Sequence, residues 1–233
     1  MAIISVIIPV YNEAPQADFY LERLADSVQS LPAETVEILL VDGGSTDQTW
    51  NICQAYSFPL YRSPRPGRAC QMNFGAEQAQ GDIFLFLHLD SQLPPHFTQA
   101  IQQVLAQPGI SAGAFRFQVD LPGGRYRLLE NLVNLRGQIC RLPYGDQGLF
   151  MTRETFAALG GFADLPIMED YDLVRRLQKR GRIVLAPLAL VTSGRRWRKL
   201  GFWKTGAINQ LIVLGYHCGV DPARLARWYR GLA

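Results

Sequence analysis

Short runs of apolar residues alternate with helical patterns in the first half of the chain. The runs at residues 3–10, 36–41 and 83–89 are continuous enough for strands that are buried on both faces of a parallel sheet. Between the first two runs, apolar residues recur at helical spacing, and residues 69–80 also fit a helix. This alternation predicts βαβ units in a Rossmann-like, mostly parallel α/β sheet.

From residue 113 the elements no longer alternate in this regular way. We therefore expect the sheet to become mixed, with helices on both faces and a helical C-terminal segment. The elements predicted for this half are a strand at 114–119, a helix near 126–136, a strand at 149–152, a helix at about 170–180, a strand at 183–185 and the C-terminal helices.

The composition is typical of a folded globular protein, but the charges are unevenly distributed along the chain. Of the 233 residues, 48% are apolar and 18% are charged, which suits one large α/β domain. The formal net charge is +3, but residues 195–233 hold eight basic residues and one acid, Asp221. An anion-binding surface is therefore expected near the C-terminal end, for a phosphate, an anionic lipid surface or RNA.

Cysteine spacing and hydropathy favour a cytoplasmic protein. The cysteines form no CxxC pair, which argues against a zinc knuckle or a disulfide framework. The apolar run at 3–10 has no basic leader and is too short to span a bilayer. Residues 202–216 are interrupted by polar side chains, so we expect a packed or interfacial helix there and no transmembrane segment.

Polar residues follow the predicted strands, where open α/β sheets bind their ligands. Asp42 ends the second strand, and the two glycines after it let the backbone turn sharply. We interpret Asp42 as a contact to a ribose or base, whereas Ser45 or Asp47 suits a cap of the helix that begins near Thr49. The alternative is that this segment is only the N-terminus of that helix.

A metal ion is expected to neutralise the phosphates of a nucleotide, because the chain has neither a Walker A motif nor a G-x-G-x-x-G motif. His88 and Asp90 are two residues apart at the end of a strand, so both face the same side and each is able to bind a divalent cation. The alternative is a solvent-facing turn before Pro94 and Pro95.

Three acids, Glu169, Asp170 and Asp172, occupy the first turn of a predicted helix. Stabilisation of the helix dipole accounts for Asp172. Asp170 follows the apolar residues 166–168, and partial desolvation there would tune its pKa for proton abstraction. We therefore predict a general base at Asp170.

Taken in order, four segments resemble the inverting glycosyltransferases of family 2. They are SVIIPVYNEA (5–14), LLVDGGSTDQT (39–49), GDIFLFLHLDSQLP (81–94) and GGFADLPIMEDYDLVRRLQKRGR (160–182). The resemblance implies a single GT-A domain over residues 1–233, with a nucleotide-binding half (1–112), an acceptor and catalytic half (113–194) and a basic helical segment (195–233). It implies transfer of a sugar from a nucleotide-diphosphate donor, UDP-linked, to an acceptor hydroxyl of unknown identity, assisted by Mn²⁺ or Mg²⁺.

The resemblance also implies roles for individual residues. Asp170 matches the family's base, and His88 with Asp90 occupies the position of the Asp-x-Asp metal motif. The nucleotide contacts carried over are Pro9, Tyr11, Glu13, Asp42, Arg68 and Asp90, and the further contacts expected to donor, acceptor or diphosphate are Asp146, Gln147, Glu169, Arg195, Arg196 and Trp197.

At two positions the chain departs from the family pattern, and these departures narrow the resemblance to a subgroup of the family. Gly43 replaces the second aspartate of the usual VDDGS, and His88 replaces the first aspartate of Asp-x-Asp, where a nitrogen donor suits manganese better than magnesium. With GDQG (145–148) and TSGRRW (192–197), these variants resemble a small bacterial subgroup associated with radical-enzyme clusters and proposed for arsenosugar formation.

Other functions fit the chain less well. A nucleotidyltransferase would carry a glycine-rich basic loop where this chain has Tyr-Asn-Glu-Ala, and a dehydrogenase would carry a dinucleotide fingerprint. A non-catalytic nucleotide-sugar or membrane-surface binding protein stays open, because His88 weakens the metal motif. Without an aromatic and basic recognition module, no nucleic-acid partner is expected. The residues from Arg195 to Trp203 also suit peripheral contact with the inner membrane face, as the alternative to diphosphate binding.

Overall fold

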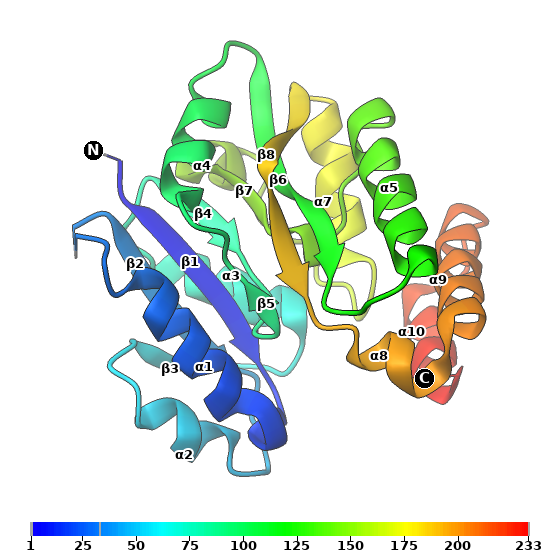
Figure 1. Cartoon of the computed structure of the whole chain (residues 1–233), viewed down its shortest axis with the longest axis horizontal. Coiled ribbons are helices and arrows are strands. Elements are labelled where there is room, and N and C mark those ends of the chain that lie inside the picture. The colour runs from blue at the N-terminus through cyan, green and yellow to red at the C-terminus, as the bar shows by residue number, and fades with distance from the viewer. Residues whose placement is uncertain (1, 33, 233) are drawn as a thin grey trace.

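The computed structural model describes residues 2–32 and 34–232 and contains one eight-stranded sheet with helices on both faces (Figure 1). The strands are β1 (Ile4–Val10), β2 (Val36–Asp42), β3 (Leu60–Arg62), β4 (Ile83–Phe86), β5 (Ser91–Gln92), β6 (Ile110–Val119), β7 (Leu149–Thr152) and β8 (Arg182–Thr192). The helices are α1 (Ala14–Val28), α2 (Thr49–Gln54), α3 (Arg68–Gln78), α4 (Phe97–Leu105), α5 (Gly124–Ile139), α6 (Arg153–Ala158), α7 (Glu169–Gln178), α8 (Arg195–Leu200), α9 (Phe202–His217) and α10 (Pro222–Leu232), with a 3-10 turn η1 (Gly145–Gln147).

The sheet is mixed, as its sequence pattern predicts, and its order is β3-β2-β1-β4-β7-β6-β8-β5. Strands β1 to β4 are parallel, while β7 runs antiparallel between β4 and β6, and β5 runs antiparallel beside β8. Because β6 and β8 are parallel to each other, six strands point the same way. Their carboxyl ends, the turn before β7 and the start of α7 therefore meet at one edge of the sheet.

Alternating side chains of the central strands supply two separate cores. Along β1, Val6 and Ile8 pack with Leu21 of α1 and Ile101 of α4 on one face of the sheet. Ile7 points to the other face and joins the core beneath α3 and α7. The twofold period of a strand explains why a continuous apolar run serves a sheet that helices cover on both faces.

Helix α5 supports the outer half of β6 through buried polar side chains. Strand β6 pairs with β7 only at Gly113 and Phe150. Beyond this pair, Asn134 accepts a hydrogen bond from Phe117 N (2.7 Å) and donates one to Phe117 O (3.0 Å), and Glu130 accepts one from Val119 N (2.9 Å). These bonds satisfy strand groups whose burial without a partner would be costly.

Three strand lengths differ from the sequence prediction, and one of them is β6, which begins at Ile110 instead of residue 114. The apolar run at 83–89 forms a strand only to Phe86, because the chain then turns and Ser91 N donates to His88 O (3.1 Å). The strand expected at 183–185 instead extends from Arg182 to Thr192. Pro187 lacks an N–H group, and the ladder with β6 accommodates it by a shift of register between Ala114 and Arg116.

The C-terminal helices form a layer against the start of α7. Ile208 and Ile212 of α9 and Leu225 of α10 pack with Met168 and Tyr171. Among the described residues, no helix combines the length and the apolar character needed to cross a membrane. The basic segment is thus a packed helical layer beside the edge where the strands end.

Candidate active site

A cavity of about 390 Å³ opens at the edge of the sheet where the parallel strands end. Its walls come from the loop after β4, the η1 turn, the start of α7 and the helices α8 to α10. This volume falls within the range of small-molecule sites. Nine of the sequence-predicted site residues line it, namely Arg68, His88, Asp90, Asp146, Glu169, Asp170, Arg195, Arg196 and Trp197.

The turn after β4 directs His88 and Asp90 into the cavity, as their spacing predicts. Burial, and to a smaller extent the charge of Arg68, lowers the pKa of His88 to about 3. The imidazole is therefore neutral at pH 7 and offers a nitrogen lone pair. Burial raises the pKa of the Asp90 carboxyl, and the charge of Arg195 partly offsets this effect.

Arg195, in the first turn of α8, ties together three segments that are far apart in the sequence. Its Nη1 donates to Glu13 Oε2 after β1 (3.0 Å), and its Nη2 lies 3.6 Å from Asp90 Oδ2 after β4. It also contacts the side chain of Gln16. Glu13 therefore reaches the site through Arg195, and Arg195 holds the start of α8 against the strand ends.

The Asp170 carboxylate is oriented by backbone N–H groups. Its Oδ2 accepts a hydrogen bond from Gly145 N and its Oδ1 accepts one from Tyr171 N, both at 2.7 Å. A Cβ atom at Gly145 would lie 2.9 Å from Asp170 Oδ2 and 3.4 Å from His88 Nε2. Gly145 is therefore the point at which the candidate base and the candidate metal ligand approach the same turn.

A left-handed residue precedes these acids. Met168, the N-cap of α7, has a φ of 69°, a conformation that side chains other than glycine seldom adopt. Its side chain is buried in the core formed with α9 and α10. That packing stabilises the turn, which delivers Glu169 and Asp170 to the cavity.

Asp146 is a partly buried acid whose Oδ1 lacks a hydrogen-bond partner among the described residues. Its Oδ1 is shielded from solvent and makes no hydrogen bond to the described residues. Burial raises the pKa of Asp146 to about 6, and the charge of Arg136 opposes the shift. A cavity-lining carboxyl in this state is ready to accept a hydrogen bond from a bound hydroxyl.

Glu169 faces a cation across the cavity wall. Its Oε1 lies 3.6 Å from Arg68 Nη1 at the start of α3. Burial raises the pKa of the Glu169 carboxyl, the neighbouring Asp170 adds to this, and Arg68 opposes it. Arg68 thus contributes positive potential near both Glu169 and His88.

Among the cations at the site, Arg196 has the most polar atoms without a hydrogen bond. Its Nε and Nη2 are buried and make no hydrogen bond to the described residues. The guanidinium stacks over the Tyr229 ring of α10, 3.8 Å from the centroid. Burial lowers the pKa of Arg196, so an anion in the cavity would stabilise its charge.

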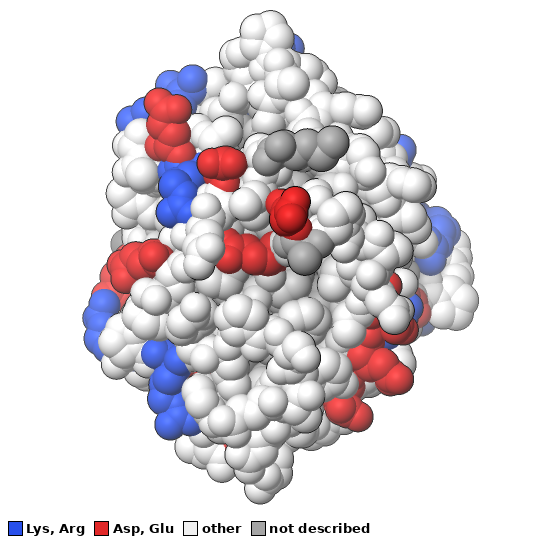
Figure 2. Space-filling model, turned by 90° about the vertical axis from the view of Figure 1, so that its left-hand side faces the viewer, with Lys and Arg blue, Asp and Glu red and all other residues white. Residues whose placement is uncertain are grey.

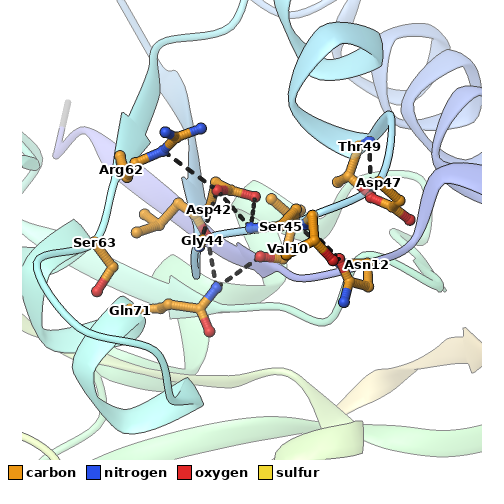
Figure 3. Close-up of polar contacts among 12 residues, drawn as sticks. Val10, Asn12, Asp42, Gly44, Ser45, Asp47, Thr49, Arg62, Ser63 and Gln71 are labelled. Atoms are coloured by element: carbon orange, nitrogen blue, oxygen red, sulfur yellow. Dashed lines mark hydrogen bonds and ion pairs between the residues drawn. The ribbon is translucent and has the colours of Figure 1, made fainter.

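Asp42 does not line this cavity. Figure 3 shows its fully buried carboxylate accepting hydrogen bonds from Gly44 N (2.9 Å) and Ser45 N (3.1 Å), with Arg62 Nε 3.7 Å away. The carboxylate thus organises the turn after β2, and its contact to a nucleoside stays a prediction. Asp47 lies one residue before Gln48, the N-cap of α2, and accepts from Thr49 N (3.0 Å) at the start of that helix.

Other predicted residues also lie outside the cavity lining. Pro9 is the last but one residue of β1, and Tyr11 follows that strand with half of its surface exposed. Gln147 is fully buried, donates to Phe115 O (3.0 Å) and accepts from Tyr144 N (3.2 Å). The structure therefore corrects the expected direct contact of Gln147 with a ligand, because its amide supports the η1 turn from behind.

Several residues that line the cavity do not follow a strand end, so the sequence analysis did not predict them. Tyr144, Thr205, Asn209 and Tyr229 line the cavity, and three of them belong to α9 and α10. Thr205 and Asn209 lie one helical turn apart in a largely apolar helix. That spacing was the signal available in the sequence, but the sequence does not show which element the polar face meets.

The donors for a metal ion at this site are few. Within residues 2–32 and 34–232, no three His, Cys, Asp or Glu side chains are grouped so that they could hold a metal ion. His88 and Asp90 together supply one neutral nitrogen and one carboxylate. This pair fits a divalent ion whose remaining ligands are water and diphosphate oxygens, as is common for phosphate-bound metals.

This architecture is the GT-A fold. A mannosyltransferase from Pyrobaculum calidifontis in complex with GDP-Man and Mn²⁺ superposes with a TM-score of 0.69 over 99% of this chain and 70% of that chain, at 20% identity. The 1–349 fragment of S. aureus TarS in complex with UDP superposes with a TM-score of 0.65 over 82% of this chain and 60% of that chain, also at 20% identity.

Sequence comparison then defines the family. Residues 5–163 match Glycosyl transferase family 2, and the chain belongs to this family. The dolichol-phosphate mannosyltransferase of Pyrococcus furiosus is 34% identical over 97 residues, which are 40% of this chain and 27% of that protein. An uncharacterized glycosyltransferase of Haemophilus influenzae is 27% identical over 190 residues, which are 75% of this chain and 61% of that protein. The chain spans less than two thirds of both relatives.

Proposed function

We propose that the protein is an inverting glycosyltransferase that moves a sugar from a nucleotide-diphosphate donor, UDP-linked, to an acceptor hydroxyl. One observation supports this most strongly. The carboxylate matched to the family's base, Asp170, lines the same cavity as Arg196, whose Nε and Nη2 make no hydrogen bond to the described residues. A base and an anion-binding cation on one cavity are what displacement of a diphosphate requires.

In the proposed reaction, Asp170 accepts the proton of the acceptor hydroxyl. Each of its oxygens already accepts one backbone hydrogen bond, which leaves further lone pairs for that proton. The hydroxyl oxygen attacks the anomeric carbon as the bond to the diphosphate oxygen breaks, so the anomeric centre inverts. Arg196 and Arg68 stabilise the charge that develops on the leaving diphosphate.

A divalent ion belongs to this proposal. His88 and Asp90 would hold it, and when bound it supplies positive charge to the diphosphate. The neutral state of His88 supports this role, because only a neutral imidazole coordinates a metal. Mn²⁺ is the ion expected from the mixed nitrogen and oxygen donors.

The basic C-terminal segment has two expected uses, and the positions of its arginines favour one of them. Arg195 and Arg196 both line the cavity. We therefore assign Arg196 to the diphosphate and Arg195 to the support of Asp90.

A donor-turnover assay tests the proposal. The purified chain, with Mn²⁺, is incubated with a panel of UDP- and GDP-linked sugars, and release of nucleoside diphosphate is measured with and without candidate acceptors. We expect release from one donor class and loss of that release in Asp170→Asn. A chain that releases no nucleotide from any donor, and that no donor stabilises, would be a binding module or a different enzyme.

A further inference from the structure

Helices α5 and α9, on the right-hand side of Figure 1, present an unusual amount of apolar surface to solvent. Seven of the ten large apolar side chains that are exposed among the described residues belong to these two helices. They are Leu128, Leu132, Leu135, Ile139, Trp203, Leu211 and Leu214, and we call them the α5/α9 surface. A concentration of this kind marks an interaction site more often than chance exposure.

The apolar residues of α5 lie on one face of the helix. Leu128, Leu132, Leu135 and Ile139 follow one another at intervals of four, three and four residues, which is the spacing of a helical stripe. The opposite face is already used, because α5 packs on β6. The exposed stripe therefore lacks a partner within the described chain.

Helix α9 continues this surface. Its inner face buries Ile208 and Ile212, while Trp203 is 84% exposed and Leu214 is 61% exposed on the other side. The two helices meet near their first turns, where the rings of Tyr126 and Phe202 contact each other edge to face. Both helices lie on the right-hand side of Figure 1, and each carries exposed apolar side chains.

The exposed charged side chains on α5, α8 and α9 themselves are cationic, and the exposed acids that flank these helices are Asp120, which pairs with Arg198 (3.0 Å), and Asp221. The acid of α5, Glu130, is buried and bonded to the backbone of β6, and neither α8 nor α9 contains an acid. Arg125, Lys199 and Lys204 are exposed beside the apolar side chains. By contrast, Figure 2 shows the side of the molecule that is away from α5 and α9, where acidic and basic side chains both reach the surface.

We propose that the α5/α9 surface binds an anionic lipid bilayer. Leucine, isoleucine and tryptophan side chains with flanking cations suit the boundary between head groups and acyl chains. A second copy of this chain fits less well, because a twofold contact would place the same cationic surface against itself. The bilayer satisfies both the apolar stripe and the surplus positive charge.

This surface places the cavity beside the membrane. Thr205, Asn209 and Ile212 of α9 line the cavity, whereas Trp203 and Leu214 project from the helix toward solvent. One helix, about 10 Å across, thus separates the bilayer from the cavity. This consequence rests on the proposed function, whereas lipid binding itself does not.

Vesicle sedimentation tests the inference without any measurement of activity. The full chain is mixed with phosphatidylcholine vesicles that contain or lack phosphatidylglycerol. We expect binding to the anionic vesicles only, and at least a tenfold loss of binding in Leu132→Glu and in Leu214→Glu. Phe19→Glu is the matched control, since Phe19 is 54% exposed on α1 and should not affect binding.

Three results would overturn the proposal. The first is failure of the wild-type chain to bind anionic vesicles. The second is a loss of binding in the Phe19 control that equals the loss in the surface variants. The third is light scattering that shows a dimer which either surface variant converts to a monomer, because the surface would then join two copies. If the variants do not fold, quenching of Trp203 fluorescence by brominated lipids in the wild type reports whether this surface contacts the bilayer. Trp203→Phe is the control for this measurement.

Discussion

Each candidate residue owes its state at the cavity to local burial and to its hydrogen-bond partners. His88 is neutral because its ring is buried and faces Arg68. Asp146 holds a proton more tightly than a free carboxyl because it is buried without a hydrogen bond to Oδ1. The sequence identifies which groups titrate, but these states depend on neighbours from other elements.

Asp170→Asn tests the role of the base. The amide has the shape of the carboxylate but accepts no proton, so we expect donor binding to persist while turnover falls on the order of a hundredfold or more. Asp172→Asn is the control on the same helix. It removes the ion pair with Arg176 (2.7 Å) and should lower stability slightly while turnover is kept. Equal losses of turnover in both variants would mean that Asp170 and Asp172 only stabilise the helix.

Asp146→Asn tests the cost of a buried acid. Because the folded protein raises the pKa of Asp146 to about 6, the folded state keeps a proton that the unfolded state has lost between about pH 4 and 6. Stability from this group therefore falls as the pH rises through that interval. We expect Asp146→Asn to be more stable than wild type above pH 6, by on the order of 2 kcal/mol, and the difference to vanish near pH 4.

Thermal melts in metal-free buffer from pH 4 to 8 measure this difference. Asp26→Asn serves as control, because Asp26 is exposed on α1 and its replacement should leave the pH profile unchanged. A wild-type protein whose stability rises relative to Asp146→Asn between pH 4 and 6 would mean that the carboxylate is favourably paired.

At the scale of elements, short turns position the site more than long helices do. The η1 turn brings Gly145 between Asp170 and His88, and α8 brings Arg195 and Arg196 to the strand ends. Both elements are too short for a periodic pattern to reveal them. Their importance follows from the edge of the sheet that they join.

Gly145→Ala tests the close approach at the η1 turn. Its Cβ would lie 2.9 Å from Asp170 Oδ2, so the carboxylate or the turn must move. We expect turnover to fall at least tenfold, as misplacement of a catalytic group does. Gly206→Ala is the control in α9, where an added Cβ meets no atom within 4 Å, and it should stabilise the protein by about 0.5–1 kcal/mol.

Arg196→Ala tests the anion contact of α8. We expect weaker binding of nucleoside diphosphate and lower turnover, while removal of a buried unpaired charge leaves stability equal or higher. Arg198→Ala in the same helix is the control, since Arg198 is exposed and pairs with Asp120 (3.0 Å). Isothermal titration with UDP and Mn²⁺ separates the variants, and equal affinities would place the diphosphate elsewhere.

At the scale of the whole molecule, ligand binding should join the two halves of the sheet. Arg195 connects the loops after β1 and β4 to the C-terminal helices, and Arg68 connects α3 to α7. A nucleotide bound across these loops stabilises only the folded chain. The melting temperature therefore reports on the site as a unit.

The melting temperature should rise with UDP and Mn²⁺ together more than with either alone. Ligand at about a hundred times its Kd adds about 2.7 kcal/mol. Asp90→Ala should abolish the metal-dependent part, and His88→Asp should keep activity but shift the preference toward Mg²⁺. Asp164→Ala, at an exposed ion pair, is the control. A metal response that survives in Asp90→Ala would remove that carboxylate from the site.

The sequence by itself determined the fold class, the two-sided core of the sheet and nine of the residues that line the cavity. Continuous apolar runs require burial on both faces, and polar residues after parallel strands must meet at one edge. Membership of the small bacterial subgroup described above stays a prediction. So does the identity of the sugar and the acceptor.

The tertiary structure decided what distant segments do to one another. It placed Gln147 behind the η1 turn, showed the Asp42 carboxylate bonded to the backbone of its own loop, and brought Thr205, Asn209 and Tyr229 to the cavity. It also left Arg196 without a partner among the described residues, whereas Arg195 is paired. Adjacent arginines are equivalent in a sequence pattern, and only the packing of α8 against the strand ends and α10 distinguishes them.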